Sequence, residues 1–379
     1  MMAGRGHLVV LAAGGSGGHV FPAEALAAEL VERGCRMALV TDRRGGHFGG
    51  NLKDIETHRI RAGGVAGKSF GARLRSAPEL ALGTWQARSL LRRINPQAVV
   101  GFGGYASVPT MLAAAYGGFS TAIHEQNAVL GRANRLLASR VGRIATSFEN
   151  SRGLPAEEDG KVIHTGMPVR PAIAAERERP YPPLDGDAPI GLLVLGGSQG
   201  ARVFSHTVPD AVGLMEEHLR RRLRISQQCR PEDLERVRQA YGRLGIEADL
   251  DVFFDDVPER MAAAHLLVSR AGASTVAEGT AIGRPAILVP YPHAIDDHQS
   301  YNAHSVDEAG AGWVMPENGF TPQALSARLN SLFDLPAILE KAASCALAVG
   351  RADAAGRLAD VVQELLPSNG EPEQGRKAA

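Results

Sequence analysis

With 379 residues, the chain is longer than one hydrophobic core usually supports, so we expect two domains. Apolar residues make up 44% and charged residues 22%, as in an ordinary globular protein. The 41 basic and 41 acidic residues cancel, which argues against a dedicated nucleic-acid-binding protein. No run approaches the roughly 18 apolar residues of a membrane-spanning helix. Three cysteines without metal-ligand spacing are typical of a reducing, cytosolic protein.

Strands and helices alternate along the first half. Residues 7–13 are an apolar run of strand length, residues 21–34 have a helical pattern that ends at Gly34, and residues 36–42 form the next strand. Further strands are predicted within 96–109, 120–127 and 141–147. This alternation is typical of a parallel, doubly wound α/β sheet.

The second half repeats this plan. Strands are predicted within 190–201, 222–228, 249–256, 265–273 and 285–292, with helices near 200–216, 231–243, 273–282 and 298–309. The residues between the halves are rich in proline and charge, and those after about 366 are polar. We therefore expect an N-terminal domain at 1–165, a linker at 166–189, a C-terminal domain at 190–366 and a disordered tail at 367–379.

Each half contains a glycine-rich turn after its first strand, "GGSGGH" from Gly14 and "GGSQGAR" from Gly196. A turn of this kind between strand and helix exposes N–H groups at the positive end of the helix dipole, which suits an anion. Parallel sheets bind ligands beyond their carboxyl ends, so two such domains are expected to face each other across one cleft.

Three short motifs give weaker indications. A nicotinamide-binding turn would need a third glycine where Val20 stands, although Asp42 suits a ribose. The segment 62–69, "AGGVAGKS", lacks the first glycine of a phosphate-binding loop, and no apolar strand leads into it. Asp249 and Asp251 form the D-x-D pattern of metal-dependent sugar transfer, but solvent-facing acids on a strand explain them better.

Seven longer motifs occur in order: "GGSGGHVFP", "GFGGYAS" with Pro109, "HEQNAVLGRANR", "GMPVRP", "LGGSQGAR", "SRAGASTVAE" and "DDHQSYNA". In this order and spacing the chain, over about residues 7–365, closely resembles the MurG family of bacterial cell-wall N-acetylglucosaminyltransferases. The resemblance implies two Rossmann-like domains of the GT-B type with an inter-domain cleft. The chain departs from the family pattern at Met167, where asparagine is common, and at Ala271, where some members have serine.

The activity implied is the inverting transfer of N-acetylglucosamine (GlcNAc) from UDP-GlcNAc to the C4 hydroxyl of undecaprenyl-diphospho-muramoyl-pentapeptide, with no cofactor or metal. Inversion needs a base at the acceptor hydroxyl and stabilisation of the departing diphosphate. The alternatives are a GT-B transferase for another lipid or small acceptor, and a non-catalytic nucleotide-sugar-binding protein. The acceptor is a membrane lipid, so the resemblance implies a peripheral protein of the cytoplasmic face of the inner membrane.

The resemblance implies a set of donor contacts. They are Ser16, Gly17, Gly18, Asn127, Arg170, Ser198, Phe254, Ala273, Ser274, Thr275, Val276, Ala277, Glu278, Gln299 and Asn302. Ser198 would bind a diphosphate oxygen with Arg202 nearby, and Glu278 would accept both ribose hydroxyls. Phe254 would lie beside the uracil, while Gln299 and Asn302 would reach the GlcNAc hydroxyls. Each has a structural alternative: Asn127 can cap a turn, Glu278 can favour a helix dipole in a first turn, and Phe254 can be a core residue.

His19 and Glu125 are the candidate bases on the acceptor side. His19 is the residue of the first turn that titrates near neutral pH, although it could instead only orient substrate. The pair His124 and Glu125 could serve the acceptor or be a structural hydrogen-bonded pair. The other acceptor-side candidates are Gly103, Gly104, Tyr105 and Asn134.

The segment 67–93 mixes basic and apolar residues. Six basic residues stand against one acid, Glu79, and the residues assigned to an anionic membrane surface are Phe70, Arg73, Leu74, Arg75 and Trp85. The alternative is a helix whose apolar side packs inward while its arginines are solvated.

Overall fold

The computed structural model describes residues 6–14, 17–42, 53–62, 70–197 and 200–367. The tail predicted from residue 367 onward lies outside the described residues, apart from Pro367. The chain forms two compact units. Unit 1 contains residues up to 126, residues 130–166 and residues from 354 onward, and unit 2 contains residues 127–129 and 167–353.

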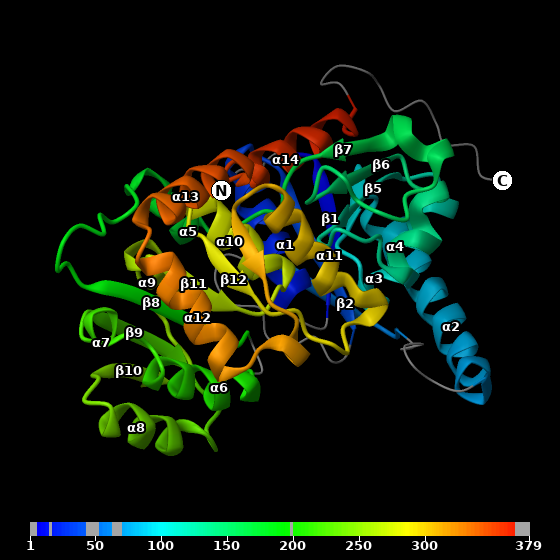
Figure 1. Ribbon diagram of the computed structural model, residues 1–379. Coiled ribbons are helices and arrows are strands. Elements are labelled where there is room, and N and C mark those ends of the chain that lie inside the picture. The colour runs from blue at the N-terminus through cyan, green and yellow to red at the C-terminus, as the bar shows by residue number, and fades with distance from the viewer. Residues whose placement is uncertain (1–5, 15–16, 43–52, 63–69, 198–199, 368–379) are drawn as a thin grey trace. The chain divides into compact units, whose positions relative to one another are not determined.

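Unit 1 is built on a seven-stranded sheet in the order β3-β2-β1-β4-β5-β6-β7, in which every pairing is parallel. Its strands are β1 (Leu8–Ala12), β2 (Arg36–Asp42), β3 (Glu56–Ile60), β4 (Ala98–Gly101), β5 (Ser120–Glu125), β6 (Arg143–Thr146) and β7 (Val162–His164). Its helices are α1 (Gly17–Glu32), α2 (Phe70–Ile94), α3 (Gly104–Tyr116), α4 (Arg132–Leu137) and α14 (Ala354–Glu364), with 3-10 turns η2 (Ala138–Arg140) and η3 (Ala156–Lys161). Figure 1 labels these helices and most of the strands.

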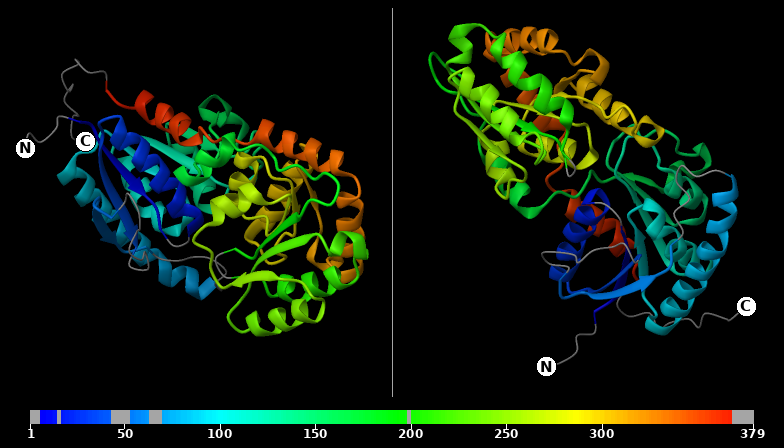
Figure 2. Two further views of the ribbon diagram at one scale, coloured as in Figure 1. Left: turned by 90° about the vertical axis from the view of Figure 1, so that its left-hand side faces the viewer. Right: turned by 90° about the horizontal axis from the view of Figure 1, so that it is seen from below.

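Alternate residues of β1 enter two separate cores. Val9 and Leu11 pack with α1 and α14, whereas Val10 and Ala12 pack on the opposite face. Figure 2 shows α1 in blue and α14 in red beside one another, and α2 and α3 also lie together. Burial on both faces explains why β1 is a continuous apolar run rather than an alternating one.

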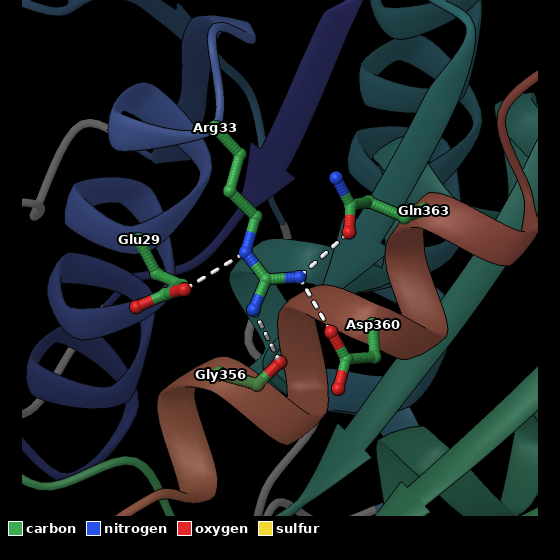
Figure 3. A network of polar contacts seen from close by, with 5 residues as sticks. All are labelled: Glu29, Arg33, Gly356, Asp360 and Gln363. Atoms are coloured by element: carbon green, nitrogen blue, oxygen red, sulfur yellow. Dashed lines mark hydrogen bonds and ion pairs between the residues drawn. The ribbon is translucent and has the colours of Figure 1, made fainter.

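The last of the described helices, α14, belongs to unit 1, although the sequence analysis placed its residues in the second domain. Arg33 at the end of α1 holds it: Nε donates to Glu29 Oε1 on its own helix at 2.8 Å, while Nη1 donates to Asp360 Oδ1 at 2.5 Å and to Gln363 Oε1 at 2.6 Å (Figure 3). Nη2 donates to the Gly356 carbonyl at 3.1 Å. Amphipathicity fixes which face of α14 is buried, but not which core receives it.

Unit 2 repeats the topology with a six-stranded parallel sheet in the order β10-β9-β8-β11-β12-β13. Its strands are β8 (Ile190–Leu195), β9 (Leu223–Gln228), β10 (Ala248–Asp251), β11 (Leu266–Ser269), β12 (Ala286–Leu288) and β13 (Gly312–Val314). Its main helices are α6 (Arg202–Gly213), α7 (Glu217–Arg220), α8 (Leu234–Arg243), α9 (Val257–Ala263), α10 (Ala273–Ile282), α11 (His298–Glu308), α12 (Pro322–Phe333) and α13 (Pro336–Val349). The predicted strand at 249–256 is therefore shorter than expected. The two Rossmann-like sheets confirm the predicted fold class.

The segment predicted as a linker, 166–189, is ordered against unit 2 from residue 167 onward. It contains α5 (Pro171–Ala175) and the 3-10 turn η4 (Glu176–Glu178). Arg177 donates from Nη1 to the Ala281 carbonyl at 2.9 Å and from Nη2 to the Leu347 carbonyl at 3.0 Å. These bonds to two helix ends make the segment part of the domain surface.

Candidate active site

Each sheet reverses its strand order at one point, and each glycine-rich turn follows a strand at that point. In unit 1 the point lies between β1 and β4, and in unit 2 between β8 and β11. Ligands of doubly wound sheets bind beyond the carboxyl ends of the strands at such a switch point. Both turns therefore stand where an open α/β sheet binds its ligand, each within its own unit. The expected cleft shared by the two units stays a prediction.

In unit 1, His19 lies in the first turn of α1 and is half-buried. Its Nδ1 is 3.2 Å from Gln126 Oε1, just beyond the end of β5. Burial lowers the pKa of His19, and the hydrogen bond to Gln126 and the negative charge of Glu125 oppose this shift. His19 is therefore poised to be neutral, with a lone pair on one ring nitrogen, near neutral pH.

His124 is completely buried at the end of β5. Its Nε2 is 3.1 Å from the Gly166 carbonyl, and its Nδ1 is 3.2 Å from Gln126 Nε2. Burial lowers the pKa of His124 to about 4, opposed by its bond to Gly166. A buried, neutral histidine with both nitrogens in hydrogen bonds fits the structural alternative of the sequence analysis.

Glu125 is also buried, and its Oε2 accepts two hydrogen bonds, from the Gly131 N–H and from Asn134 Nδ2, both at 2.8 Å. Gly131 is the N-cap residue of α4, so the carboxylate lies where a helix dipole favours negative charge. Asn134 also donates to the His124 carbonyl at 3.2 Å. The hydrogen bonds of Glu125 and Asn134 thus join the end of β5 to the start of α4.

The remaining acceptor-side candidates of unit 1 are at the start of α3. Gly103 precedes the helix with φ 75°, and a Cβ there would be 3.3 Å from Asn134 Nδ2. Tyr105, the second residue of α3, is half-buried. Gly17 and Gly18 begin α1, whereas Ser16 lies outside the described residues. His19, Gln126, Gly103, Gly104 and Asn134 are therefore brought together at one edge of the sheet.

In unit 2, the chain approaches itself closely at the glycine turn. A Cβ on Gly196 would lie 2.4 Å from the Ala201 backbone nitrogen, so no larger residue fits. Ser198 lies outside the described residues. Arg202 begins α6 with an exposed side chain, and its Nε donates to His206 Nε2 at 3.1 Å.

The first turn of α10 follows β11, the strand next to β8 in the sheet. Its N-cap residue is Gly272, and the first N–H bond within the helix runs from Val276 to the Gly272 carbonyl. The N–H groups of Ala273, Ser274 and Thr275 therefore have no partner within the helix, as at any helix start. Ala277 is half-exposed in the second turn, where its N–H is aligned with the Ala273 carbonyl of the same helix, so the free donors are those of the first turn.

Glu278 is the sixth residue of α10, and its first turn contains no acid. The helix-dipole explanation, which assumed a first-turn position, is therefore wrong, because helical residues begin at Ala273. The carboxylate is mostly buried and forms a two-pronged ion pair with Arg170, the N-cap residue of α5. Nε–Oε1 is 2.8 Å and Nη2–Oε2 is 3.0 Å.

Phe254 is buried, with 5% of its surface exposed, and the Arg260 guanidinium stacks 4.1 Å from its ring centroid. This arrangement matches the core alternative of the sequence analysis. Asp249 and Asp251 both face solvent on β10, and Asp249 pairs with Arg260 at 2.5 Å. The D-x-D pattern thus has the alternating exposure expected of a strand.

Asn302, on α11, is completely buried. Its Oδ1 accepts from the Ala128 N–H at 2.8 Å, and its Nδ2 donates to Asn127 Oδ1 at 3.1 Å and to the Ala271 carbonyl at 3.0 Å. Both of its amide hydrogens are thereby used within unit 2. Gln299, half-exposed one turn earlier, accepts from the Tyr291 N–H at 2.9 Å.

Two residues at these edges were missed by the sequence analysis, although both stand in quoted motifs. Gln126 of "HEQN" is 3% exposed and contacts His19. Arg270 of "SRAGAST" directly follows β11, donates to the Val289 and Pro290 carbonyls at 3.2 Å and pairs with Glu317. A polar residue next to a strand end is the signal that could have found them.

The predicted membrane segment is α2, a helix of 25 residues that begins at Phe70. Phe70, Arg73, Leu74 and Arg75 lie in its first turns. Further along, Ala87, Leu90 and Leu91 are buried, whereas Trp85 is 67% exposed and Arg92 and Arg93 face solvent. None of the described helices is long and apolar enough to cross a membrane.

Comparison with known proteins agrees with this architecture. Residues 9–146 match the glycosyltransferase family 28 N-terminal domain, and residues 191–358 match the family 28 C-terminal domain. A solved structure of MurG from Acinetobacter baumannii superposes with a TM-score of 0.78 at 29% identity, covering 94% of this chain and 99% of that one.

Two relatives share the name "UDP-N-acetylglucosamine--N-acetylmuramyl-(pentapeptide) pyrophosphoryl-undecaprenol N-acetylglucosamine transferase". The one from Paramagnetospirillum magneticum is 60% identical over 361 residues, which cover 95% of this chain and 97% of the relative. The one from Rhodospirillum rubrum is 56% identical and covers 93% of this chain and 91% of the relative. With both family 28 domains in place and this identity along its length, the chain belongs to the MurG family of glycosyltransferases.

Proposed function

We propose that the protein transfers GlcNAc from UDP-GlcNAc to the C4 hydroxyl of undecaprenyl-diphospho-muramoyl-pentapeptide, with inversion at the sugar carbon. The product is the lipid-linked disaccharide precursor of peptidoglycan. The observation that carries this proposal is the 60% identity, over 95% of the chain, to a relative named for this transfer. The proposal is supported by the strand order, which puts a glycine-rich turn after the strand at each switch point, where such sheets bind ligands.

In the proposed step, the acceptor C4 oxygen forms a bond to C1 of GlcNAc from the side opposite the departing UDP. The bond from C1 to the diphosphate oxygen breaks with its electron pair on UDP. The hydroxyl proton goes to His19, which acts as the general base. His19 is favoured over Glu125 because its lowered pKa keeps it neutral, while Glu125 Oε2 already accepts two hydrogen bonds from the protein.

Donor binding is assigned to unit 2. The N–H groups of the glycine turn, with Ser198, and the first turn of α10 would hold the diphosphate and stabilise the charge that develops on it. Glu278 would accept the two ribose hydroxyls, because each carboxylate oxygen has a second lone pair beyond the one used by Arg170. Gln299 would contact the GlcNAc hydroxyls.

We further propose that α2 rests on the anionic, cytoplasmic face of the inner membrane, where the lipid acceptor lies. The support is an exposed aromatic residue, Trp85, and the solvent-facing Arg92 and Arg93 two turns further along the same helix. Such a surface combines apolar insertion with attraction to anionic headgroups. The protein would then be peripheral rather than membrane-spanning.

Release of UDP from UDP-GlcNAc tests the transfer. We expect release that depends on a lipid-linked muramoyl-pentapeptide and yields an equal amount of disaccharide. Release with other lipid or sugar acceptors alone would support a different transferase. Tight UDP-GlcNAc binding without turnover on any acceptor would indicate a non-catalytic nucleotide-sugar-binding protein.

A further inference from the structure

Gln126 occupies a position in unit 1 at which its side-chain amide can be oriented in only one way. Its Nε2 lies 3.0 Å from the Phe102 carbonyl and 3.0 Å from the His124 carbonyl. Carbonyl oxygens only accept hydrogen bonds, so the NH2 end of the amide must face them. Its oxygen, Oε1, is therefore the atom that faces His19.

This orientation determines where His19 carries its proton. Gln126 Oε1 has no hydrogen to donate, so His19 Nδ1, 3.2 Å away, must be the donor. In the neutral ring the lone pair then resides on Nε2. An amide at this site accepts the bond without adding a negative charge, in contrast to a carboxylate.

The hydrogen bonds of His124, on the other side of Gln126, agree with this assignment. His124 can give its one hydrogen to the Gly166 carbonyl from Nε2, which leaves a lone pair on Nδ1, 3.2 Å from the NH2 nitrogen of Gln126. Because burial keeps His124 neutral, this arrangement of donors and acceptors does not change near neutral pH. The titratable groups that face His19 are His124 and Glu125, both on β5.

The Nε2 edge of His19 lies against Gly104, which has φ 69°. A Cβ at Gly104 would be 3.3 Å from His19 Nε2 and 3.2 Å from Cδ2. The missing side chain therefore leaves the Nε2 edge of the imidazole less crowded than any other residue at position 104 would.

We propose that Gln126 is a positioning residue that holds His19 in its Nδ1–H tautomer and so presents Nε2 as the proton acceptor. This inference rests on the proposed function, in which His19 is the base. In this role Gln126 acts on the reaction only through His19.

Nitrogen-15 NMR of the histidine rings in the full-length protein tests the tautomer directly. The protein has 12 histidines, and the His19 signals are identified as those missing from the His19→Ala variant. We expect wild-type His19 near neutral pH to carry hydrogen on Nδ1, and Gln126→Met to shift it toward the Nε2–H form. Wild-type His19 protonated on Nε2, or a tautomer unchanged by Gln126→Met, would overturn the inference.

Kinetics supply the second readout. Gln126→Met should lower kcat by about 10- to 1000-fold, less than complete loss of the base, while the KM for UDP-GlcNAc changes little. The matched control is Gln97→Met, because Gln97 Oε1 supports the Leu8 N–H at 2.7 Å at the start of β1, the opposite end of the strand from His19. It should leave both tautomer and kcat unchanged. A Gln126→Met enzyme with normal kcat would overturn the positioning role.

The two proposals fail in different ways. If His19→Ala kept normal turnover, the proposed base would be wrong even with the tautomer as expected. If His19→Ala lost turnover while the wild-type tautomer was Nε2–H, His19 would remain the proposed base, but the positioning role of Gln126 would be wrong. The wild-type spectrum decides this without any variant of Gln126 having to fold.

Discussion

Arg170 holds Glu278 by both carboxylate oxygens, at 2.8 and 3.0 Å, so the carboxylate has one orientation in unit 2. Two parallel bonds fix a carboxylate plane more strictly than one. The partners are 108 positions apart in the chain, and Arg170 stands in the segment that the sequence analysis treated as a linker. That segment therefore contributes to the geometry of the proposed donor site.

Replacing Glu278 with alanine should weaken UDP-GlcNAc binding by about 1.5 to 3 kcal/mol, the scale of hydrogen bonds to a charged group. Isothermal titration calorimetry measures this directly. Glu259→Ala, which removes an exposed acid from α9 in the same unit, should bind the donor normally. Unchanged donor affinity in a folded Glu278→Ala protein would remove Glu278 from the ribose site.

His19→Ala should lower kcat by about 10² to 10⁴, the usual cost of losing a general base, with little change in UDP-GlcNAc affinity. The wild-type rate should fall on acidification as His19 becomes protonated. Because burial lowers the pKa of His19, the midpoint of this fall in rate should lie below pH 6.5. The His19→Ala variant should not show the fall. Normal turnover with poor donor affinity would make His19 a binding residue and Glu125 the next candidate.

Replacing Arg73, Arg75 and Trp85 together should reduce binding to anionic vesicles and slow transfer to a long-chain lipid acceptor, while a short-chain soluble acceptor is used normally. Vesicle co-sedimentation and paired rate measurements check this. A matched control replaces Leu214, Arg221 and Arg243, an exposed apolar residue and two exposed arginines before strands β9 and β10. An equal loss of transfer rate with both acceptors would indicate a folding defect. An unchanged rate with both would indicate that α2 is a solvated helix with no membrane role.

His124 should make folding of unit 1 sensitive to acid. Its pKa is 6.5 in the unfolded chain and about 4 in the folded one, so the unfolded state binds the proton first as pH falls. The free energy of unfolding should therefore drop between about pH 6.5 and pH 4, by up to about 3 kcal/mol. Urea unfolding followed by circular dichroism at several pH values measures this slope.

The variant His124→Gln should flatten this pH dependence, because it removes the titrating group. His304→Gln, the same substitution at an exposed site on α11 in unit 2, is the matched control. A wild-type slope that persists in His124→Gln would assign the acid sensitivity to another group.

The glycine turns were predictable from sequence because their signals are local: an apolar strand, glycines and then a helical pattern. Such signals place Gly196 at a strand end without any tertiary information. The same is true of His19 in the first turn of α1. The two sheets, and the edge at which each would bind a ligand, follow from the alternation alone.

The role of Gln126 could not be predicted in this way, because its contact with His19 joins residues 107 positions apart. Asn302 was expected to reach a sugar, yet burial commits both of its amide hydrogens to unit 2. Whether the polar atoms of a side chain already have protein partners depends on packing, which cannot be read from a sequence motif. The position of Glu278 in α10 likewise depended on where the helix begins.

The attachment of α14 to α1 also fixes an order of events during synthesis on the ribosome. Domains usually fold as they emerge, the N-terminal one first. Leu358, Ala359 and Val362 belong to the same core as Leu26 and Leu30, so that core stays incomplete until unit 2 and then α14 have been translated. The first unit to be synthesised is therefore the last to be finished, and a nascent chain stalled before residue 354 exposes the apolar face of α1 to chaperones and proteases.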